Sequence, residues 1–141
     1  MKYLLGVDLG TSGTRTALFN LSGEVILAKS VEYRLYQPNN GWAEQDPKDW
    51  WDAAVTTISY VVRESGVDPS DIASLGISGQ MHGLVMLDEK GEVLRPSIIW
   101  ADQRTGEECA EMTRPRLGSS RREVSEERAL MTGQGAASVA A

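Results

Sequence analysis

Short apolar runs separated by turn-forming residues open the chain, and they predict β-strands. The runs cover residues 3–9, 14–20 and 24–35 and are rich in the branched and aromatic residues that strands favour. Residues 20–23 read Asn-Leu-Ser-Gly, which predicts a turn between the second and third runs. Residues 36–46 are rich in Pro, Asn and Gly and are therefore expected to form a loop.

Helical periodicity follows this loop. Asp46 is expected to cap the helix, with Pro47 at its first position and Asp49 in its first turn. Gly66 and Pro69 are expected to end it. The apolar face predicted to pack on the core consists of Trp51, Ala54, Val55, Ile58, Val61 and Val62.

Shorter elements are predicted further along the chain. Residues 72–78 form an apolar run, which predicts a buried strand parallel to the first one. Residues 84–87 and 92–94 predict a hairpin that turns at residues 88–91, Asp-Glu-Lys-Gly. A second helix is expected over about residues 102–112, with Asp102 as its cap.

The turn near the N-terminus carries the most informative chemistry. Residues 6–13, Gly-Val-Asp-Leu-Gly-Thr-Ser-Gly, take an apolar strand into one carboxylate and then into glycines and hydroxyls. Glycines let backbone N–H groups approach an anion, and Thr11 and Ser12 add hydroxyl donors. Asp8 stands where a carboxylate could hold Mg²⁺ through water. The pattern indicates a cradle for phosphate and metal, or else an ordinary hairpin with a glycine turn. It lacks the features of a P-loop or a Rossmann fingerprint.

Three further segments support nucleotide chemistry. They read Gly-Trp-Ala-Glu-Gln-Asp-Pro at 41–47 with Trp50-Trp51, Leu-Gly-Ile-Ser-Gly-Gln-Met-His-Gly at 75–83, and Arg-Pro-Ser-Ile-Ile-Trp-Ala-Asp-Gln-Arg at 95–104. With residues 6–13, in this order, they resemble the N-terminal part of the FGGY family of carbohydrate kinases. The resemblance covers about residues 1–113. It is greatest to the xylulose kinases, because of the Gln-Met-His-Gly segment.

This resemblance implies an α/β chain with the actin-like, ribonuclease H-like ATPase fold, whose first strands form one antiparallel meander. It implies a phosphotransferase with an alcohol acceptor, which uses ATP and Mg²⁺ to convert D-xylulose to D-xylulose 5-phosphate. Asp8 matches the family's metal-linked aspartate. Thr11, Ser12, Gly13 and Arg15 match positions that reach the ATP phosphates, although Arg15 could be a solvated strand residue.

On the sugar side, Met81 and His82 match the sugar-contacting pair of the xylulose kinases. An imidazole can donate to one sugar hydroxyl and accept from another, and the alternative is a packed, hydrogen-bonded histidine. Trp100 and Asp102 match a segment that lines the sugar pocket. Trp100 could stack on a sugar or belong to the core, and Asp102 could only cap its helix. For Trp42, Glu44 and Asp46, local structure and helix entry are the preferred interpretation.

Composition narrows the class of protein. The net charge of −6 argues against nucleic acid or an anionic membrane as partner. The one cysteine, Cys109, excludes an intramolecular disulfide and fits a reducing cytoplasm, and one Cys with one His leaves no zinc site. No run approaches transmembrane length, and no signal peptide is recognisable. A cytoplasmic protein is expected.

The resemblance also implies a much longer enzyme, with two actin-like domains around a cleft. Residues 114–141 depart from the family and end in a low-complexity run, which predicts a disordered tail. A truncated gene product, a frameshift or a fragmentary assembly would each account for this. The family's general base is a downstream aspartate with no match here, so the 141-residue chain is expected to be inactive alone. Uncovered apolar surface would favour self-association, for example as a homodimer.

Three alternatives stay open. The first is another FGGY kinase, acting on ribulose, gluconate, glycerol or a similar polyol. The second is a non-catalytic remnant that binds a sugar or a nucleotide. The third is an ATPase of the actin or chaperone kind, against which the segments at 80–83 and 100–104 speak.

Overall fold

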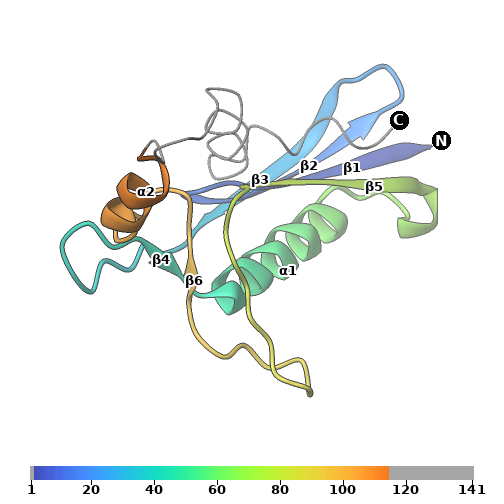
Figure 1. The fold of residues 1–141 in the computed structure, drawn as a ribbon. Helices are drawn as coiled ribbons and strands as arrows, with labels where there is room; N and C mark the ends of the chain where they lie inside the picture. The colour runs from blue at the N-terminus through green and yellow to red at the C-terminus, as the bar shows by residue number, and fades with distance from the viewer. Residues whose placement is uncertain (1, 115–141) are drawn as a thin grey trace.

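The computed structural model describes residues 2–114, and the predicted tail lies outside them. The elements in chain order are β1 (Tyr3–Leu9), β2 (Gly13–Asn20), β3 (Val25–Glu32), β4 (Glu44–Gln45), α1 (Pro47–Glu64), η1 (Pro69–Asp71), β5 (Ile72–Gly79), β6 (Ser97–Ile98) and α2 (Gly106–Met112). The four long strands form one sheet in the order β3-β2-β1-β5, and α1 lies across one face of it (Figure 1). β4 and β6 pair separately as a short ribbon.

The sheet confirms the predicted meander. β1 pairs antiparallel with β2, and β2 with β3, while β5 joins the other edge of β1 in parallel. Short turns suffice for antiparallel neighbours, whereas a parallel neighbour needs a long crossover, and α1 supplies it. The third strand ends at Glu32, earlier than expected, because the chain then leaves the sheet toward the loop.

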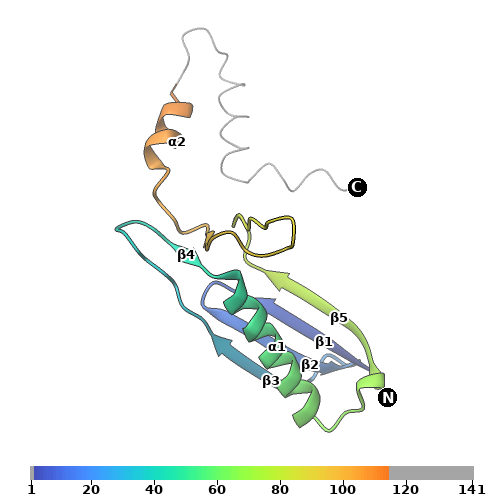
Figure 2. The same cartoon turned by 90° about the horizontal axis from the view of Figure 1, so that it is seen from below.

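α1 begins as the sequence predicts. The Asp46 carboxylate accepts a hydrogen bond from the Lys48 N–H at 2.9 Å, and Pro47 takes the first helical position. Figure 2 shows the helix running across the sheet. Its Val61 packs with Leu5 and Leu18 to form the buried core cluster. Full burial of one such side chain stabilises the fold by about 1.5–3 kcal/mol.

The predicted buried face of α1 is partly wrong. Trp51 is 70% exposed and Val55 is 44% exposed, whereas Ala53 and Thr57 are buried beside Val61. The reason is a polar residue at the centre of the contact. Thr57 accepts from the Thr16 hydroxyl at 2.8 Å and donates to the Ala53 carbonyl, so its burial leaves no unpaired hydroxyl. The pattern of hydrophobic residues along the sequence gives no sign of such a hydrogen-bonded pair.

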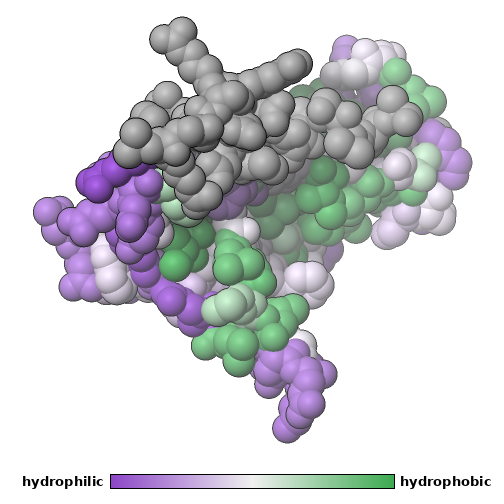
Figure 3. All heavy atoms as spheres, in the orientation of Figure 1, coloured by the Kyte–Doolittle hydropathy of each residue, from purple (hydrophilic) through white to green (hydrophobic). Residues whose placement is uncertain are grey.

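The predicted burial of β5 is also wrong, although the strand and its parallel pairing are confirmed. Residues 73–79 are exposed, with Ile77 at 70%, because α1 packs over β2 and β3 and leaves the β5 edge uncovered. The loop after β5 is likewise apolar and exposed, for example at Leu84 and Leu94. Figure 3 shows hydrophobic residues at the surface over the sheet and over this loop.

The hairpin predicted over residues 84–94 forms only in part. Asp88 turns the chain by accepting from the N–H groups of Lys90 and Glu92, and Leu87 bridges Val93. No strand is assigned there, and β6 follows where none was predicted. In the part of the chain that the structure describes, no helix has the length and apolar character needed to cross a membrane.

Candidate active site

Two of the predicted site segments, the N-terminal turn and residues 80–83, lie beside each other where β1 and β5 end. The two strands are parallel and in register to their last residues, Leu9 beside Gly79, and the Gln80 N–H donates to the Leu9 carbonyl at 2.9 Å. The N-terminal turn (residues 10–13) and residues 80–83 therefore leave the sheet from adjacent points. Ligands of open α/β sheets bind outside the carboxyl ends of such strands.

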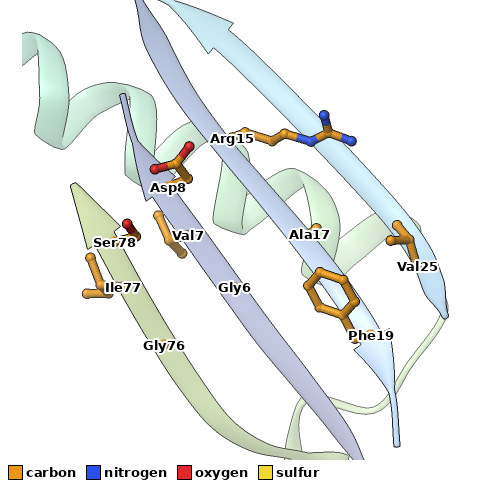
Figure 4. Close-up of a pocket in the computed structure, with 10 residues that line it drawn as sticks. All are labelled: Gly6, Val7, Asp8, Arg15, Ala17, Phe19, Val25, Gly76, Ile77 and Ser78. Atoms are coloured by element: carbon orange, nitrogen blue, oxygen red, sulfur yellow. The ribbon is translucent and has the colours of Figure 1, made fainter. Parts of the chain in front are cut away.

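Asp8 lies on the sheet face opposite α1. Leu5 and Leu18 point toward the helix, so the alternation of strand side chains turns Asp8 and its partner Arg15 to the other face. Both are exposed and line a shallow groove of about 520 Å³ with Gly6 and other sheet residues. In Figure 4 the Arg15 guanidinium extends over β3 and not toward Asp8. The Asp8 carboxylate thus stays accessible to a ligand.

A lone accessible carboxylate suits Mg²⁺ better than it suits a transition metal. Mg²⁺ retains several waters and takes one or two carboxylates together with phosphate oxygens. Among residues 2–114, no group of three or more His, Cys, Asp or Glu side chains gathers as a metal site. Asp8 therefore fits a metal held mainly through water and a bound phosphate.

The N-terminal turn is held tightly from behind by β3. Gly10 N–H bonds to the Gly13 carbonyl at 3.0 Å, and a Cβ on Gly13 would stand 2.6 Å from the Val31 carbonyl oxygen, so only glycine fits there. The Tyr33 hydroxyl donates to the Gly10 carbonyl, and the Tyr33 N–H donates to that of Ser12. Burial raises the pKa of the Tyr33 phenol. Nothing in the sequence distinguishes Tyr33 from the other residues of the strand predicted over residues 24–35.

Thr11 presents unused donors. Its carbonyl accepts from Gln45 Nε2 at 2.7 Å, and its Oγ1 accepts from Trp100 Nε1 at 3.1 Å. The hydroxyl hydrogen of Thr11 therefore remains available. Within the described residues, the backbone N–H groups of Thr11 and Ser12 also donate to no protein acceptor. Such a set of donors on a glycine-flanked turn fits an anion such as phosphate.

Gln45 joins this turn to residues 80–83. Its side chain is fully buried, and its Oε1 accepts from Trp50 Nε1 at 3.1 Å and from Gln80 Nε2 at 2.6 Å. The Gln80 Oε1 is itself buried and has no hydrogen-bond partner among the described residues. No role was predicted for Gln45 or Gln80 from the sequence. Both lie inside the quoted motifs, but no periodicity marks a polar loop residue as buried.

Met81 and His82 project at the surface beside this network. Met81 is 70% exposed, and His82 is exposed and has no protein hydrogen bond in the described part of the chain, so a packed histidine is not what forms. The His82 φ is 63°, in the left-handed region. That conformation costs on the order of 1–3 kcal/mol in a non-glycine residue, and such strain concentrates at ligand sites.

Trp100 and Asp102 differ from each other in their surroundings. Trp100 is 57% exposed, so it is not a core aromatic, and its indole N–H is directed to Thr11. Asp102 does not cap a helix, because α2 starts at Gly106. Its carboxylate instead accepts from Arg104 Nε and Nη2 and from the Ala43 N–H at 2.6 Å. The Arg104 hydrogen bonds lower the pKa of Asp102 to about 2.

The loop of residues 41–46 has the structural role that its sequence favours. The Arg104 guanidinium stacks on the Trp42 ring at 3.7 Å and bonds to Glu44 Oε1 at 2.7 Å. Arg95 Nη2 reaches the same oxygen at 2.6 Å. This cluster fastens the loop to the segment that carries Trp100.

Residues 3–138 match the N-terminal domain of the FGGY family of carbohydrate kinases. The chain belongs to this family. The match covers all four sequence motifs and continues past residue 113, where the resemblance predicted from the motifs ends. The predicted recognition and the actin-like fold are thereby confirmed.

Named relatives agree with the family. The chain is 44% identical over 113 residues to the xylulose kinase of Bacillus subtilis, covering 80% of this chain and 23% of that protein. It also matches the crystal structure of a xylulose kinase from Rhodospirillum rubrum, at 36% identity and a TM-score of 0.73, over 79% of this chain and 23% of the other. A gluconate kinase from Lactobacillus acidophilus matches at 34% identity with a TM-score of 0.72, over 78% of this chain and 22% of the other. The chain therefore spans less than a quarter of these proteins.

Proposed function

We propose that this chain carries the first wall of the active site of an ATP-dependent sugar kinase, whose substrate is a ketopentose and above all D-xylulose. One observation carries the proposal. The unused donors of the N-terminal turn and the exposed pair Met81–His82 leave the sheet from the adjacent ends of β1 and β5, joined by the Gln80 to Leu9 hydrogen bond. Phosphoryl transfer depends mainly on this kind of mutual positioning.

On the phosphate side, the proposed group is Mg-ATP. Asp8 would hold the metal through water, and the Thr11 and Ser12 N–H groups and hydroxyls would donate to phosphate oxygens. Gly13 lets the turn lie flat against β3, and Arg15 adds positive charge on the same sheet face. When bound, Mg²⁺ supplies neutralisation of the charge on the transferring phosphoryl group.

On the sugar side, Met81, His82 and Trp100 are the proposed contacts. The His82 imidazole can pair with two sugar hydroxyls, and the exposed Trp100 ring offers an apolar face. Asp102 has its oxygens engaged by Arg104 and Ala43, so we assign it the role of holding the Trp100 segment. The xylulose kinase relatives support xylulose, and the gluconate kinase match keeps gluconate as the second candidate.

Conversion of D-xylulose to its 5-phosphate also needs a base, and no residue here matches the family's downstream aspartate. We therefore propose that the 141-residue chain by itself does not phosphorylate D-xylulose. Its uncovered sheet face favours self-association, and the reducing cytoplasm is its proposed location.

A chimera tests the proposal. Residues 1–113 of this chain replace the matching segment of the Bacillus subtilis xylulose kinase, and ADP and sugar phosphate are assayed together. D-Xylulose should support turnover in the range of that parent enzyme, and gluconate or glycerol should support at least tenfold less, about 1.4 kcal/mol. A folded chimera that prefers gluconate would replace xylulose with the second candidate. Turnover by the isolated chain would contradict its proposed inactivity.

A further inference from the structure

The side chain of Gln45 joins three segments that are far apart in the sequence. It donates to the Thr11 carbonyl, and it accepts from Trp50 in the first turn of α1 and from Gln80 at the end of β5. A buried amide is costly unless its polar atoms are paired. Both Gln45 lone pairs and one of its two N–H groups are used here.

A second connection closes a loop through the same residue. The Gln45 backbone pairs with Ser97 in the β4–β6 ribbon, and β6 leads to Trp100, which donates to the Thr11 hydroxyl. One oxygen of Thr11 is thus held by Gln45 in β4, and the other is held by Trp100 in the segment that follows β6. The N-terminal turn cannot shift relative to residues 80–83 or Trp100 without breaking a bond in this loop.

We propose that Gln45 is a positioning residue that couples the phosphate side of the site, at Thr11, to the sugar side, at residues 80–83. The inference rests on the proposed function, which names the two sides. A displacement of Gln80 is transmitted through Gln45 to Thr11, because one rigid amide bonds to both. Sugar and Mg-nucleotide bound together therefore change each other's affinity.

Amide hydrogen exchange in the 141-residue chain tests the coupling without any ligand. The reporters are the bonded N–H groups of Gly10 and Tyr33 in or beside the turn. Gln80→Met, which alters only the sugar side, should raise their exchange rates about fivefold, the loss of about one net hydrogen bond. In a Gln45→Met background, the same change should raise them less than twofold.

Matched variants separate positioning from general stability. Thr57→Val removes the buried hydrogen bond between the hydroxyls of Thr16 and Thr57. Its effect on the exchange rates of the Gly10 and Tyr33 N–H groups should be within twofold of its effect on the rate of the Ser65 N–H after α1. If Gln45→Met does not fold, Trp50→Phe replaces it, since Trp50 and Gln80 donate to the same Gln45 oxygen and their effects must then be non-additive. Additive effects, or turn amides unchanged by Gln80→Met, overturn the proposal.

A titration distinguishes this inference from the proposed function. The affinity for Mg-ADP is measured with and without saturating D-xylulose, and the two values should differ about fivefold in the wild type and by less than twofold in Gln45→Met. Two ligands that bind without affecting each other overturn the coupling. If neither ligand binds, the proposed function of this chain fails, and the exchange rates alone decide the role of Gln45.

Discussion

Two regions of the molecule are held together in different ways. The sheet with α1 is stabilised by an apolar cluster of Leu5, Leu18 and Val61. The β4–β6 ribbon and its flanking segments are joined by amide, indole and ion-pair contacts, such as those of Gln45 and Arg104. Apolar burial is strong and non-directional, whereas hydrogen bonds are individually weaker and fix geometry. The first region therefore supplies stability, and the second holds the N-terminal turn relative to residues 80–83 and Trp100.

The largest expected effect comes from breaking the apolar region. Leu18→Ala opens a cavity at a fully buried position and should lower the free energy of unfolding by about 2–5 kcal/mol. Leu21→Ala, at a residue 69% exposed in the turn after β2, is the control and should change it by less than about 0.5 kcal/mol. Urea unfolding of both variants measures the difference. Equal losses would mean that the cluster is not the main source of stability.

Asp8 lies on the stable sheet, but its proposed role is in catalysis and not in folding, and Asp8→Asn separates the two. In the chimera with the Bacillus subtilis kinase, kcat should fall about 100-fold while the KM for D-xylulose changes less than threefold. The melting temperature should stay the same, since the side chain is exposed. An equal loss of affinity for D-xylulose would mean that Asp8 has a structural role and does not position the metal.

The polar region should be the acid-sensitive one. Arg104 lowers the pKa of Asp102 to about 2 from an ordinary value near 3.8. A carboxylate with a depressed folded pKa contributes stability that is present above the unfolded pKa and is lost as the pH falls through the folded one. Stability should therefore decline between about pH 4 and pH 2, and Asp102→Asn should flatten that part of the profile. A profile unchanged by Asp102→Asn would contradict this ion pair.

The smallest expected effect belongs to His82, which is exposed and contributes nothing to the core. In the chimera, His82→Ala should lower kcat/KM for D-xylulose about tenfold, as the loss of one good polar contact does, and raise KM. Stability should not fall, because a strained left-handed residue is being replaced by another non-glycine residue. Unchanged kinetics would remove His82 from the proposed sugar site.

Sequence reasoning succeeded where one local rule decided the outcome. The meander strands, the Asp46 cap and the parallel pairing of β5 followed from apolar runs, capping residues and a family resemblance. It failed where a neighbour decided. Trp51 and Ile77 are large apolar residues of the kind found in cores, but they remain exposed, because burial depends on which part of the sheet α1 covers.

The elements and the kinds of chemistry present can be read from the amino-acid sequence, since periodicity, capping and glycine-rich turns act over a few neighbouring residues. The folded chain is needed to see that Gln45 reaches Thr11 and Gln80, that Asp102 pairs with Arg104 and Ala43, and that Trp100 bonds to Thr11. These contacts join residues up to 89 positions apart. A short polar side chain carries no local signal of such a partner, because its burial becomes favourable only when the fold brings the matching donor or acceptor to it.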